Sequence, residues 1–337
     1  MSDLVILPLT IVSVSFLLTL FFTIAARKIL LRHAMLDLPN ERSSHTAPVP
    51  RGGGWALLIV LVPGMLLAGA VDRDLARYGW IIAGTLLLAL ISWLDDKKGV
   101  SAMKRLSFHI LAACIGSFAF ADGATLFQGM LPFWLDRALM IIGWAWFMNL
   151  YNFMDGIDGI TGTETIAIAT GVCAVMTATG INDPFIANLT LLLTGACLGF
   201  LTLNWYPAKI FLGDVGSVPL GFLSGFLLLA LATEGYLIPA LILPLYYLAD
   251  SGITLAKRAW RREKIWQAHR QHFYQVGAQS LGRHDKVVFR ILAADILLIA
   301  AALIAINYRV FGLALGMLTV AILLWKLHKK PHEISAP

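Results

Sequence analysis

The chain is dominated by long hydrophobic runs that are separated by short polar segments. Most runs approach the roughly 20 residues that a helix needs to cross a bilayer. Eleven can be delimited, namely 4–26, 52–70, 78–94, 106–122, 131–153, 160–180, 185–204, 215–233, 236–256, 287–306 and 310–327. Polar residues interrupt the fifth and the sixth. The pattern predicts an all-α polytopic membrane protein of about 11 transmembrane helices, with 1–337 as a single domain.

Composition strengthens this interpretation and narrows the class of protein. Of the 337 residues, 58% are hydrophobic and 14% are charged, whereas soluble domains are about half apolar and a quarter charged. A typical soluble enzyme is therefore excluded. The net charge of +6 would suggest nucleic acid in a soluble protein. In a membrane protein it indicates basic cytoplasmic loops, so we predict no nucleic-acid partner.

The basic residues gather in alternate loops, which orients the predicted spans. Of the 26 Lys and Arg residues, 21 lie on one side and three on the other. Basic loops face the cytoplasm, so the N-terminus is predicted to be periplasmic and the C-terminus cytoplasmic. The predicted cytoplasmic loops are 27–51, 95–105, 154–159, 205–214 and 257–286.

Carboxylates stand at the cytoplasmic ends of several spans, among these basic loops. They are Asp95 and Asp96, Asp155 and Asp158, and Asp214. Gathered acids at a membrane boundary are costly to desolvate and repel one another. A divalent cation removes both costs, and oxygen ligands favour Mg²⁺ or Mn²⁺. The alternative is that each acid simply ends a helix in the headgroup region.

Two of these acids have informative neighbours. Asn149, Asn152 and Asp155 are three residues apart, so a helix would place them in one strip; the alternative is a polar contact between helices. Asp214 lies between two glycines at the predicted start of a helix. Glycine allows a close approach of backbone to ligand, and a helix N-terminus favours phosphate. The pattern indicates a site for a nucleoside diphosphate and its metal ion.

Five polar blocks in order carry a resemblance to a known family. They are DLPNERSSHTAPVPRGGG (37–54), LDDKKG (94–99), NLYNFMDGIDGI (149–160), NWYPAKIFLGDVGS (204–217) and HRQHFYQ (269–275). With these blocks the chain resembles the polyprenyl-phosphate N-acetylhexosamine-1-phosphate transferases of glycosyltransferase family 4, the WecA/MraY-like group. The similarity is greatest to the bacterial branch that initiates O-antigen or related lipopolysaccharide glycans.

The resemblance implies a reaction and its partners. A sugar 1-phosphate would pass from a UDP-N-acetylamino sugar to undecaprenyl phosphate, giving undecaprenyl-diphospho-sugar and UMP. The enzyme would be a Mg²⁺-dependent phosphoglycosyltransferase in the bacterial inner membrane, with its active site on the cytoplasmic face and lipids around it. The sequence leaves open which donor sugar is used, and whether the chain forms a homodimer.

The resemblance also implies roles for individual residues. Asp95, Asp96 and Asp214 would be catalytic. The Asp95–Asp96 pair would lie near the lipid phosphate, and Asp95 would deprotonate that phosphate. Asp214 would bind Mg²⁺ together with Asn152. The nucleotide side would include Asn149, Asp155, Asp158 and Asn204. The sugar and diphosphate would contact His269, Arg270 and His272. The first cytoplasmic loop contributes a family signature of open role, Asn40, Arg42 and His45.

The late block departs from part of the family. Muramyl-pentapeptide transferases carry three adjacent histidines there, whereas this chain has His269 and His272 with two residues between them. This argues against muramyl-pentapeptide as the donor. An alternative for the segment is a solvated basic loop that binds anionic headgroups.

Two other functions compete with transfer. A polyprenyl-lipid transporter or flippase would need polar groups on a path open to both sides, often with repeat symmetry, and no internal repeat is visible. A non-catalytic scaffold would leave the five polar blocks unexplained. Glu164 and Asp295 lie inside predicted spans, where ionisable residues are functional candidates; the sequence assigns neither a role.

Overall fold

A computed structural model describes residues 2–38, 47–264 and 269–328. Almost all of its regular structure is helical, and its two strands pair in one short antiparallel hairpin. The elements are α1 (Ser2–Arg32), β1 (Leu36–Asp37), β2 (Val49–Pro50), α2 (Gly54–Asp72), α3 (Leu75–Lys98), α4 (Ala102–Ser117), α5 (Phe133–Phe153), α6 (Ile160–Thr179), α7 (Pro184–Asn204), α8 (Asp214–Leu231), the π-helical turn η1 (Ala232–Tyr236), α9 (Leu237–Ile242), α10 (Leu245–Trp260), α11 (Phe273–Leu281), α12 (His284–Ala305) and α13 (Arg309–His328). The predicted all-α fold is confirmed.

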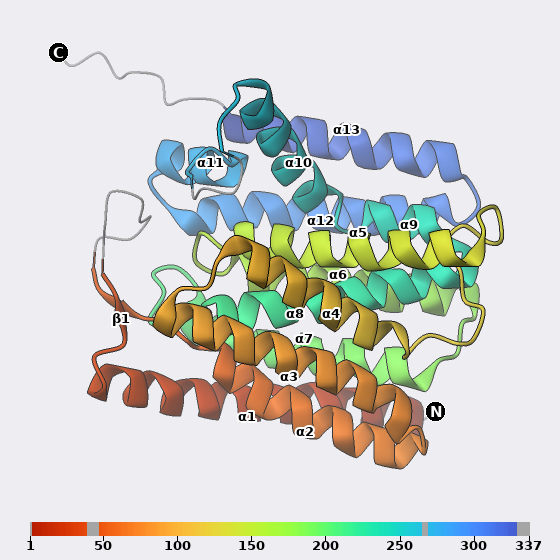
Figure 1. Ribbon diagram of the computed structural model, residues 1–337, viewed down its shortest axis with the longest axis horizontal. Coiled ribbons are helices and arrows are strands. Elements are labelled where there is room, and N and C mark those ends of the chain that lie inside the picture. Colours follow the sequence, from red (N-terminus) through yellow and green to blue (C-terminus); the bar gives the residue numbers. More distant parts are fainter. Residues whose placement is uncertain (1, 39–46, 265–268, 329–337) are drawn as a thin grey trace.

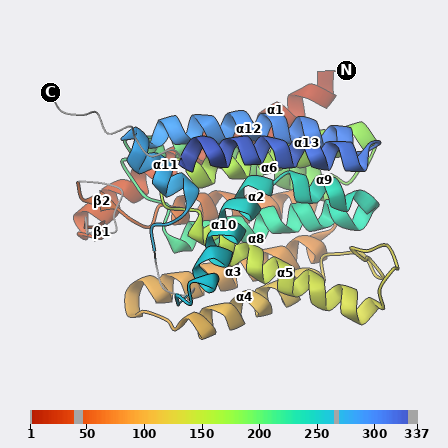
Figure 2. The ribbon, with the colours of Figure 1, turned by 90° about the horizontal axis from the view of Figure 1, so that it is seen from above.

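Most of the helices lie side by side along the long axis of the molecule (Figures 1 and 2). α1 begins at the right of Figure 1, whereas α13 ends at the left. The polar blocks of the sequence gather at the left. We call this the motif end: the end where α3, α5 and α7 finish and where α2, α6, α8 and α11 begin.

The outer surface of the bundle is that of a protein embedded in lipid. Large apolar side chains such as Phe21, Leu67 and Val310 are exposed, at a density that a soluble protein rarely shows. Exposed tryptophans lie near both ends of the bundle, with Trp260 and Trp325 near one end and Trp134 near the other. The aromatic belts of membrane proteins have this distribution. Within the described ranges, eight helical segments are long and apolar enough to span a membrane. The chain is a multi-pass membrane protein.

The structure divides one predicted span differently. The runs 215–233 and 236–256 meet at a kink inside η1, where Gly235 has a non-helical φ of 91° and ψ of 4°. The helix of the second run is then broken before α10 at Pro244, which lacks a backbone N–H. The remaining two predicted runs outside the eight correspond to α4, of 16 residues, and to α5, which carries polar residues at both ends. The count of about 11 spans stays a prediction, as does the orientation of the termini in the cell.

The core is centred on α8, nearly all of whose residues are buried. It packs against α2, α3, α5 and α6. Trp144 stacks on Phe222 at 4.6 Å between ring centroids, and its indole N–H donates to the Phe222 carbonyl at 2.9 Å. The buried Trp thereby satisfies its only donor, and it fixes α5 against α8.

Glycines bring the start of α2 onto the start of α8 at the motif end. A Cβ on Gly54 would lie 2.3 Å from the Cα of Gly216, so only glycine permits this approach. The Gly53 and Gly54 amides donate to the Phe211 and Leu212 carbonyls, both at 2.9 Å. The segment that carries Arg51 is therefore held alongside the segment that leads into Asp214.

Two buried carboxyl groups lie inside the bundle without hydrogen-bond partners. Glu164 on α6 and Asp295 on α12 are 0% and 2% exposed, and none of their four carboxyl oxygens has a partner in the described part of the chain. The charge of Asp295 acts on Glu164, because the two helices pack together. The partner that the sequence could not assign to Asp295 is therefore another acid.

These acids should oppose folding rather than stabilise it, since a buried carboxyl without partners has lost its hydration. We expect Glu164→Gln, and Asp295→Asn, to leave the melting temperature of the purified protein in detergent unchanged or to raise it by a few degrees.

Asp136 on α5 is the matched control, because this buried carboxylate accepts hydrogen bonds from the Leu126 and Phe127 amides at 2.8 and 2.9 Å. Asp136→Asn should cost about 1–3 kcal/mol. A Glu164→Gln protein that melts as early as Asp136→Asn would show that Glu164 has partners after all.

Candidate active site

Arg51 lies at the centre of the motif end, between two of the predicted catalytic aspartates. Its Nη2 is 2.7 Å from Asp214 Oδ1 and 3.3 Å from Asp96 Oδ1. Burial opposes the charge of the guanidinium, but Asp214 and Asp96 together raise the pKa of Arg51. The structure thus joins three sequence blocks through one cation, which offsets the mutual repulsion of the carboxylates.

The neighbouring Asp95 is held by a different set of contacts. Its Oδ2 lies 2.8 Å from Arg105 Nη1 on α4, and its Oδ1 accepts from the Val100 amide at 2.5 Å. The two adjacent aspartates therefore point to different partners, Asp96 to Arg51 and Asp95 to Arg105. Asp95 thus has Arg105 as its partner, whereas Asp96 shares Arg51 with Asp214.

Asn149 and Asn152 lie on the last turns of α5 and face the same region. Asn152 Oδ1 accepts from Ser217 Oγ on α8 at 2.6 Å, while the Asn149 amide donates to the Ala145 carbonyl. The predicted helical strip does not reach Asp155, because α5 ends at Phe153. Asp155 lies in the connection to α6.

A small cavity of about 20 Å³ shows that the blocks converge. Four predicted site residues line it together: Asp95, Asn149, Asn152 and Asp214. They come from three of the five blocks and from α3, α5 and α8. A cavity of this size has room for about one water molecule.

Asp155 lies near this centre, since the charges of Asp214 and Arg51 both act on it. Burial raises the pKa of Asp155 to about 6, against the effect of its hydrogen bond from Thr161 Oγ1 at 2.6 Å. A carboxyl held in this way titrates close to neutral pH and responds to a nearby positive charge.

Asp158 and Asn204 are paired within the protein. Asp158 Oδ2 accepts from the Ala208 amide at 2.9 Å, and its Oδ1 is 3.1 Å from His284 Nδ1 on α12. Asn204 accepts from the Gly159 amide at 3.1 Å and donates to the Ile210 carbonyl at 2.9 Å. The two side chains thereby join the 154–159 connection to the 205–213 connection, and they fix the position of both.

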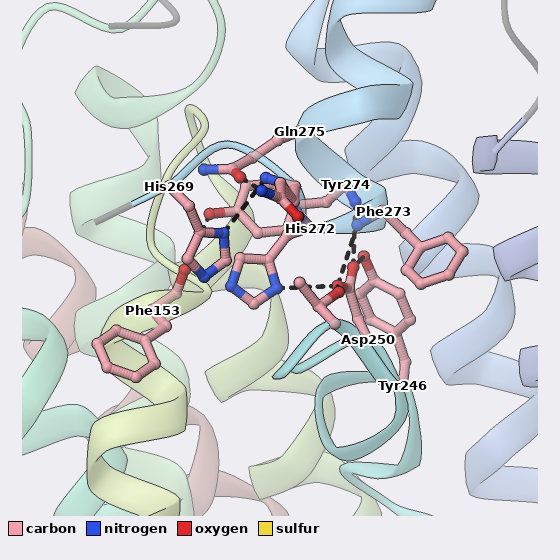
Figure 3. A network of polar contacts seen from close by, with 10 residues as sticks. Phe153, Tyr246, Asp250, His269, His272, Phe273, Tyr274 and Gln275 are labelled. Atoms are coloured by element: carbon pink, nitrogen blue, oxygen red, sulfur yellow. Dashed lines mark hydrogen bonds and ion pairs between the residues drawn. The ribbon is translucent and has the colours of Figure 1, made fainter. Parts of the chain in front are cut away.

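Residues 269–275, which we call the histidine segment, are organised by Asp250, which is fully buried on α10 (Figure 3). Asp250 Oδ1 lies 3.0 Å from His272 Nδ1 and accepts from the Phe273 amide at 3.0 Å. Its Oδ2 accepts from the Tyr274 amide at 3.0 Å. The carboxylate thus caps α11 and orients the imidazole. Tyr274 in turn donates to the Phe153 carbonyl at 2.9 Å, which joins the segment to α5.

His269 stacks on His272 with 4.8 Å between ring centroids (Figure 3). Burial, and then the neighbouring His272 and Arg258, lower the pKa of His269 to about 4. The ring is therefore neutral at pH 7. His269 offers a hydrogen bond or a stacking face at this pH, and Arg270 brings positive charge to the segment.

The structure does not bring all predicted residues to one point. The aspartates and asparagines line one centre, and the histidine segment adjoins it through Tyr274 and Phe153. Arg270 faces a second cavity beside α10 and α13. The predicted signature residues Asn40, Arg42 and His45 lie outside the described residues.

The donor set fits a magnesium ion that is completed by substrate. No group of three or more His, Cys, Asp and Glu side chains in the described ranges is arranged to hold a metal alone. Magnesium usually takes only one or two carboxylates together with substrate phosphates. Asp214 and the Asn152 amide oxygen border the same cavity, and Asp214 already holds a cationic group, that of Arg51.

Several residues of the site were not predicted. Arg51 and Arg105 counted only as basic loop residues, and Asp250 was not among the predicted site residues. Arg51 is in the block PRGGG, whose three glycines signal a close backbone contact. For Arg105 and Asp250 no sequence pattern indicated the partner, because each pairs across the fold.

The fold and this site define a multi-pass membrane protein with a polar centre at one end of its bundle. A family model described as glycosyl transferase family 4 matches residues 78–232, a range that includes Asp95, Asp96, Asn152 and Asp214. Over this part of the chain, and through the relatives below, the protein is similar to that family.

Named relatives belong to three kinds of transferase. The "Probable undecaprenyl-phosphate N-acetylglucosaminyl 1-phosphate transferase" of Bacillus subtilis is 27% identical over 274 residues, 77% of this chain and 74% of the relative. The decaprenyl-phosphate N-acetylglucosaminephosphotransferase of Mycolicibacterium smegmatis is 29% identical over 62% of this chain and 56% of the relative. The phospho-N-acetylmuramoyl-pentapeptide-transferase of Synechococcus elongatus is 31% identical over 55% of this chain and 54% of the relative. The chain thus spans little more than half of the latter two.

The environment of His269 makes a testable prediction. Because burial and nearby positive charge oppose its protonation, we expect its ring resonances to titrate with a midpoint near pH 4 in NMR spectra of histidine-labelled protein. The signal is assigned by its loss in His269→Gln. A midpoint at or above the ordinary value of about 6.5 would contradict the described environment.

Proposed function

We propose that this protein transfers an N-acetylamino-sugar 1-phosphate from a UDP-sugar to undecaprenyl phosphate, as the first membrane step of O-antigen or related surface glycan synthesis. The products are undecaprenyl-diphospho-sugar and UMP. The named relatives support the reaction class, since each is a transferase and the Bacillus subtilis and Mycolicibacterium smegmatis proteins are named for a polyprenyl phosphate. The donor sugar is open between N-acetylglucosamine, N-acetylgalactosamine and 6-deoxy N-acetylamino sugars.

One observation carries the proposal: the acids of separate blocks meet around Arg51. Asp96 and Asp214 both form ion pairs with the guanidinium of Arg51, and the adjacent Asp95 forms an ion pair with Arg105. A site that holds several carboxylates together with arginines can bind anions and cations at the same place. A diphosphate and its metal ion are such a pair of ligands.

The bond changes in the proposed step are simple. An oxygen of the lipid phosphate attacks the sugar-bearing phosphorus of the UDP-sugar. A new P–O–P bond forms, the bond from that phosphorus to the bridging oxygen of UMP breaks, and UMP leaves with the electron pair. We favour this direct attack over a covalent aspartyl intermediate, because the lipid phosphate is itself a nucleophile.

Both reactants are anionic, so the site must offset their repulsion. Mg²⁺, or Mn²⁺, bound by Asp214 and Asn152 would neutralise charge on the diphosphate and on departing UMP. Arg51 and Arg105 lie beside these residues and can donate to phosphate oxygens. Asp95 is assigned to the proton of the lipid phosphate. A phosphate with a second pKa of about 6 is largely ionised at pH 7, so this task is minor.

The remaining residues position the substrates in this proposal. Asn149, Asp155, Asp158 and Asn204 shape the nucleotide side, the latter two through the contacts that join their connections. His269 and His272 would contact the sugar and diphosphate, whereas Arg270, which was assigned to the same role, faces the second cavity. We place the site on the cytoplasmic face of the bacterial inner membrane, because 21 of the 26 basic residues lie in the loops of the motif end and the C-terminal tail.

The direct test is release of UMP from a panel of UDP-sugars, with purified protein, undecaprenyl phosphate and Mg²⁺. We expect UMP from an N-acetylamino donor, a requirement for the lipid phosphate, and loss of turnover when EDTA removes the metal. Movement of polyprenyl lipid across vesicles without UMP release would favour a flippase instead. No UMP with any donor would refute the proposal.

Two variants serve as controls in the same assay. Asp214→Asn should lower turnover by about a hundredfold or more, since it removes a ligand that acts on developing charge. Asp95→Asn should cost less, because the lipid phosphate needs little help to ionise. The reverse order would contradict the assigned roles while leaving the reaction class intact.

A further inference from the structure

A second cavity at the motif end lies outside the centre around Arg51. It has a volume of about 250 Å³ and lies between the second half of α10, the start of α11 and the end of α13. Pockets for drug-sized ligands are roughly 300–1,000 Å³. This cavity is smaller, of the size expected for a headgroup rather than a nucleotide sugar.

Cationic side chains from two elements line the cavity, and no carboxylate does. They are Lys257 in the last turn of α10, Arg261 directly after the end of that helix, and Arg270 from the segment before α11. Lys257 Nζ lies 4.9 Å from the ring centre of Phe273, and no carboxylate among the described residues is within 4 Å of Lys257 or Arg261. Lys257 and Arg261 thus form no ion pair with a described acid, unlike Arg51 and Arg105.

The cavity lies at the depth of the headgroups. Trp260, the last residue of α10, is 91% exposed, and Trp325 on the last turn of α13 is 60% exposed. Exposed tryptophans at helix ends mark the boundary between lipid and water. His328 ends α13 one turn beyond Trp325 and borders the cavity. The buried Phe273 forms its apolar side.

From these observations we infer that the cavity between α10, α11 and α13 is a binding site for the phosphate of an anionic phospholipid headgroup. Lys257 and Arg261 would hold the phosphate oxygens through charge-assisted hydrogen bonds. The acyl chains would run along the exposed apolar side of α13, where Leu318 and Ile322 face outward. Basic pockets between helix ends are suited to this class of ligand.

The site would connect lipid binding to the histidine segment. Arg270 borders the cavity, and its neighbours His269 and His272 belong to the cluster on Asp250. A lipid phosphate in the cavity would therefore brace the chain between α10 and α11. The inference does not depend on the proposed transfer reaction, and its test reads lipid binding alone.

The experiment uses the full chain in detergent with an equimolar mixture of phosphatidylglycerol and phosphatidylcholine of identical acyl chains. Native mass spectrometry counts the lipid that is retained. We expect the wild type to retain phosphatidylglycerol in preference to phosphatidylcholine. The double variant Lys257→Gln/Arg261→Gln should retain about tenfold less phosphatidylglycerol, because it loses two charge-assisted contacts.

Lys28→Gln/Arg32→Gln is the matched control. These two exposed basic residues are one turn apart, at the end of α1, and they lie away from the cavity. The control should keep its phosphatidylglycerol within about twofold of wild type, since isolated surface charges contribute little. Unchanged melting temperatures would confirm that both variants are folded.

Three results would overturn the inference. The first is equal retention of the two lipids by the wild type. The second is an equal loss in both double variants, which would mean that surface charge alone attracts the lipid. The third is retention of inorganic phosphate at millimolar concentration in place of phosphatidylglycerol, which would make the occupant a free phosphate.

Discussion

The site depends on one close contact, the crossing of the chain before α2 over the chain before α8. Gly54 and Gly216 allow the two backbones to meet, and hydrogen bonds from Gly53 and Gly54 hold them together. Because of this contact Arg51 reaches Asp214 and Asp96 at once. Without it, carboxylates would face one another at a membrane boundary with no compensating cation, at a high electrostatic cost. The glycines of two distant blocks therefore serve the electrostatics of the site as well as the packing.

The apolar pattern predicted the fold well, since the length and hydrophobicity of the runs decide which segments are helical. It did not predict the break at Pro244, because a long apolar segment has the same hydrophobic pattern with or without a turn. The aspartate and asparagine candidates were found because carboxylates at span ends are conspicuous. Arg51, Arg105 and Asp250 were not, since their partners are 163, 10 and 22 residues away and only the folded chain brings them together. The predicted strip through Asp155 was wrong because α5 ends two residues earlier.

Charge is used in three ways at the motif end. Arg51 and Arg105 compensate carboxylates within the candidate active site. Asp250 accepts hydrogen bonds from the His272 ring and the start of α11, which fixes the histidine segment without exposing charge. Lys257 and Arg261 form no ion pair with an acid of the described chain, and in the inferred site they would hold a lipid phosphate. A basic loop is thus not a uniform surface. Glu164 and Asp295 form the one region of the described bundle where buried charge is left without compensation, and there stability rather than binding is affected.

The central claim is that Arg51 and Asp214 act as one unit in the transfer of sugar phosphate. A double-mutant cycle on UMP formation tests it most directly, with Arg51→Gln, Asp214→Asn and the double variant measured against wild type. If the two residues act together, each single variant loses about a hundredfold or more in kcat/KM, and the double variant is no slower than the worse single one. Losses that multiply in the double variant would mean that the two residues act independently, and the account of this centre would be wrong.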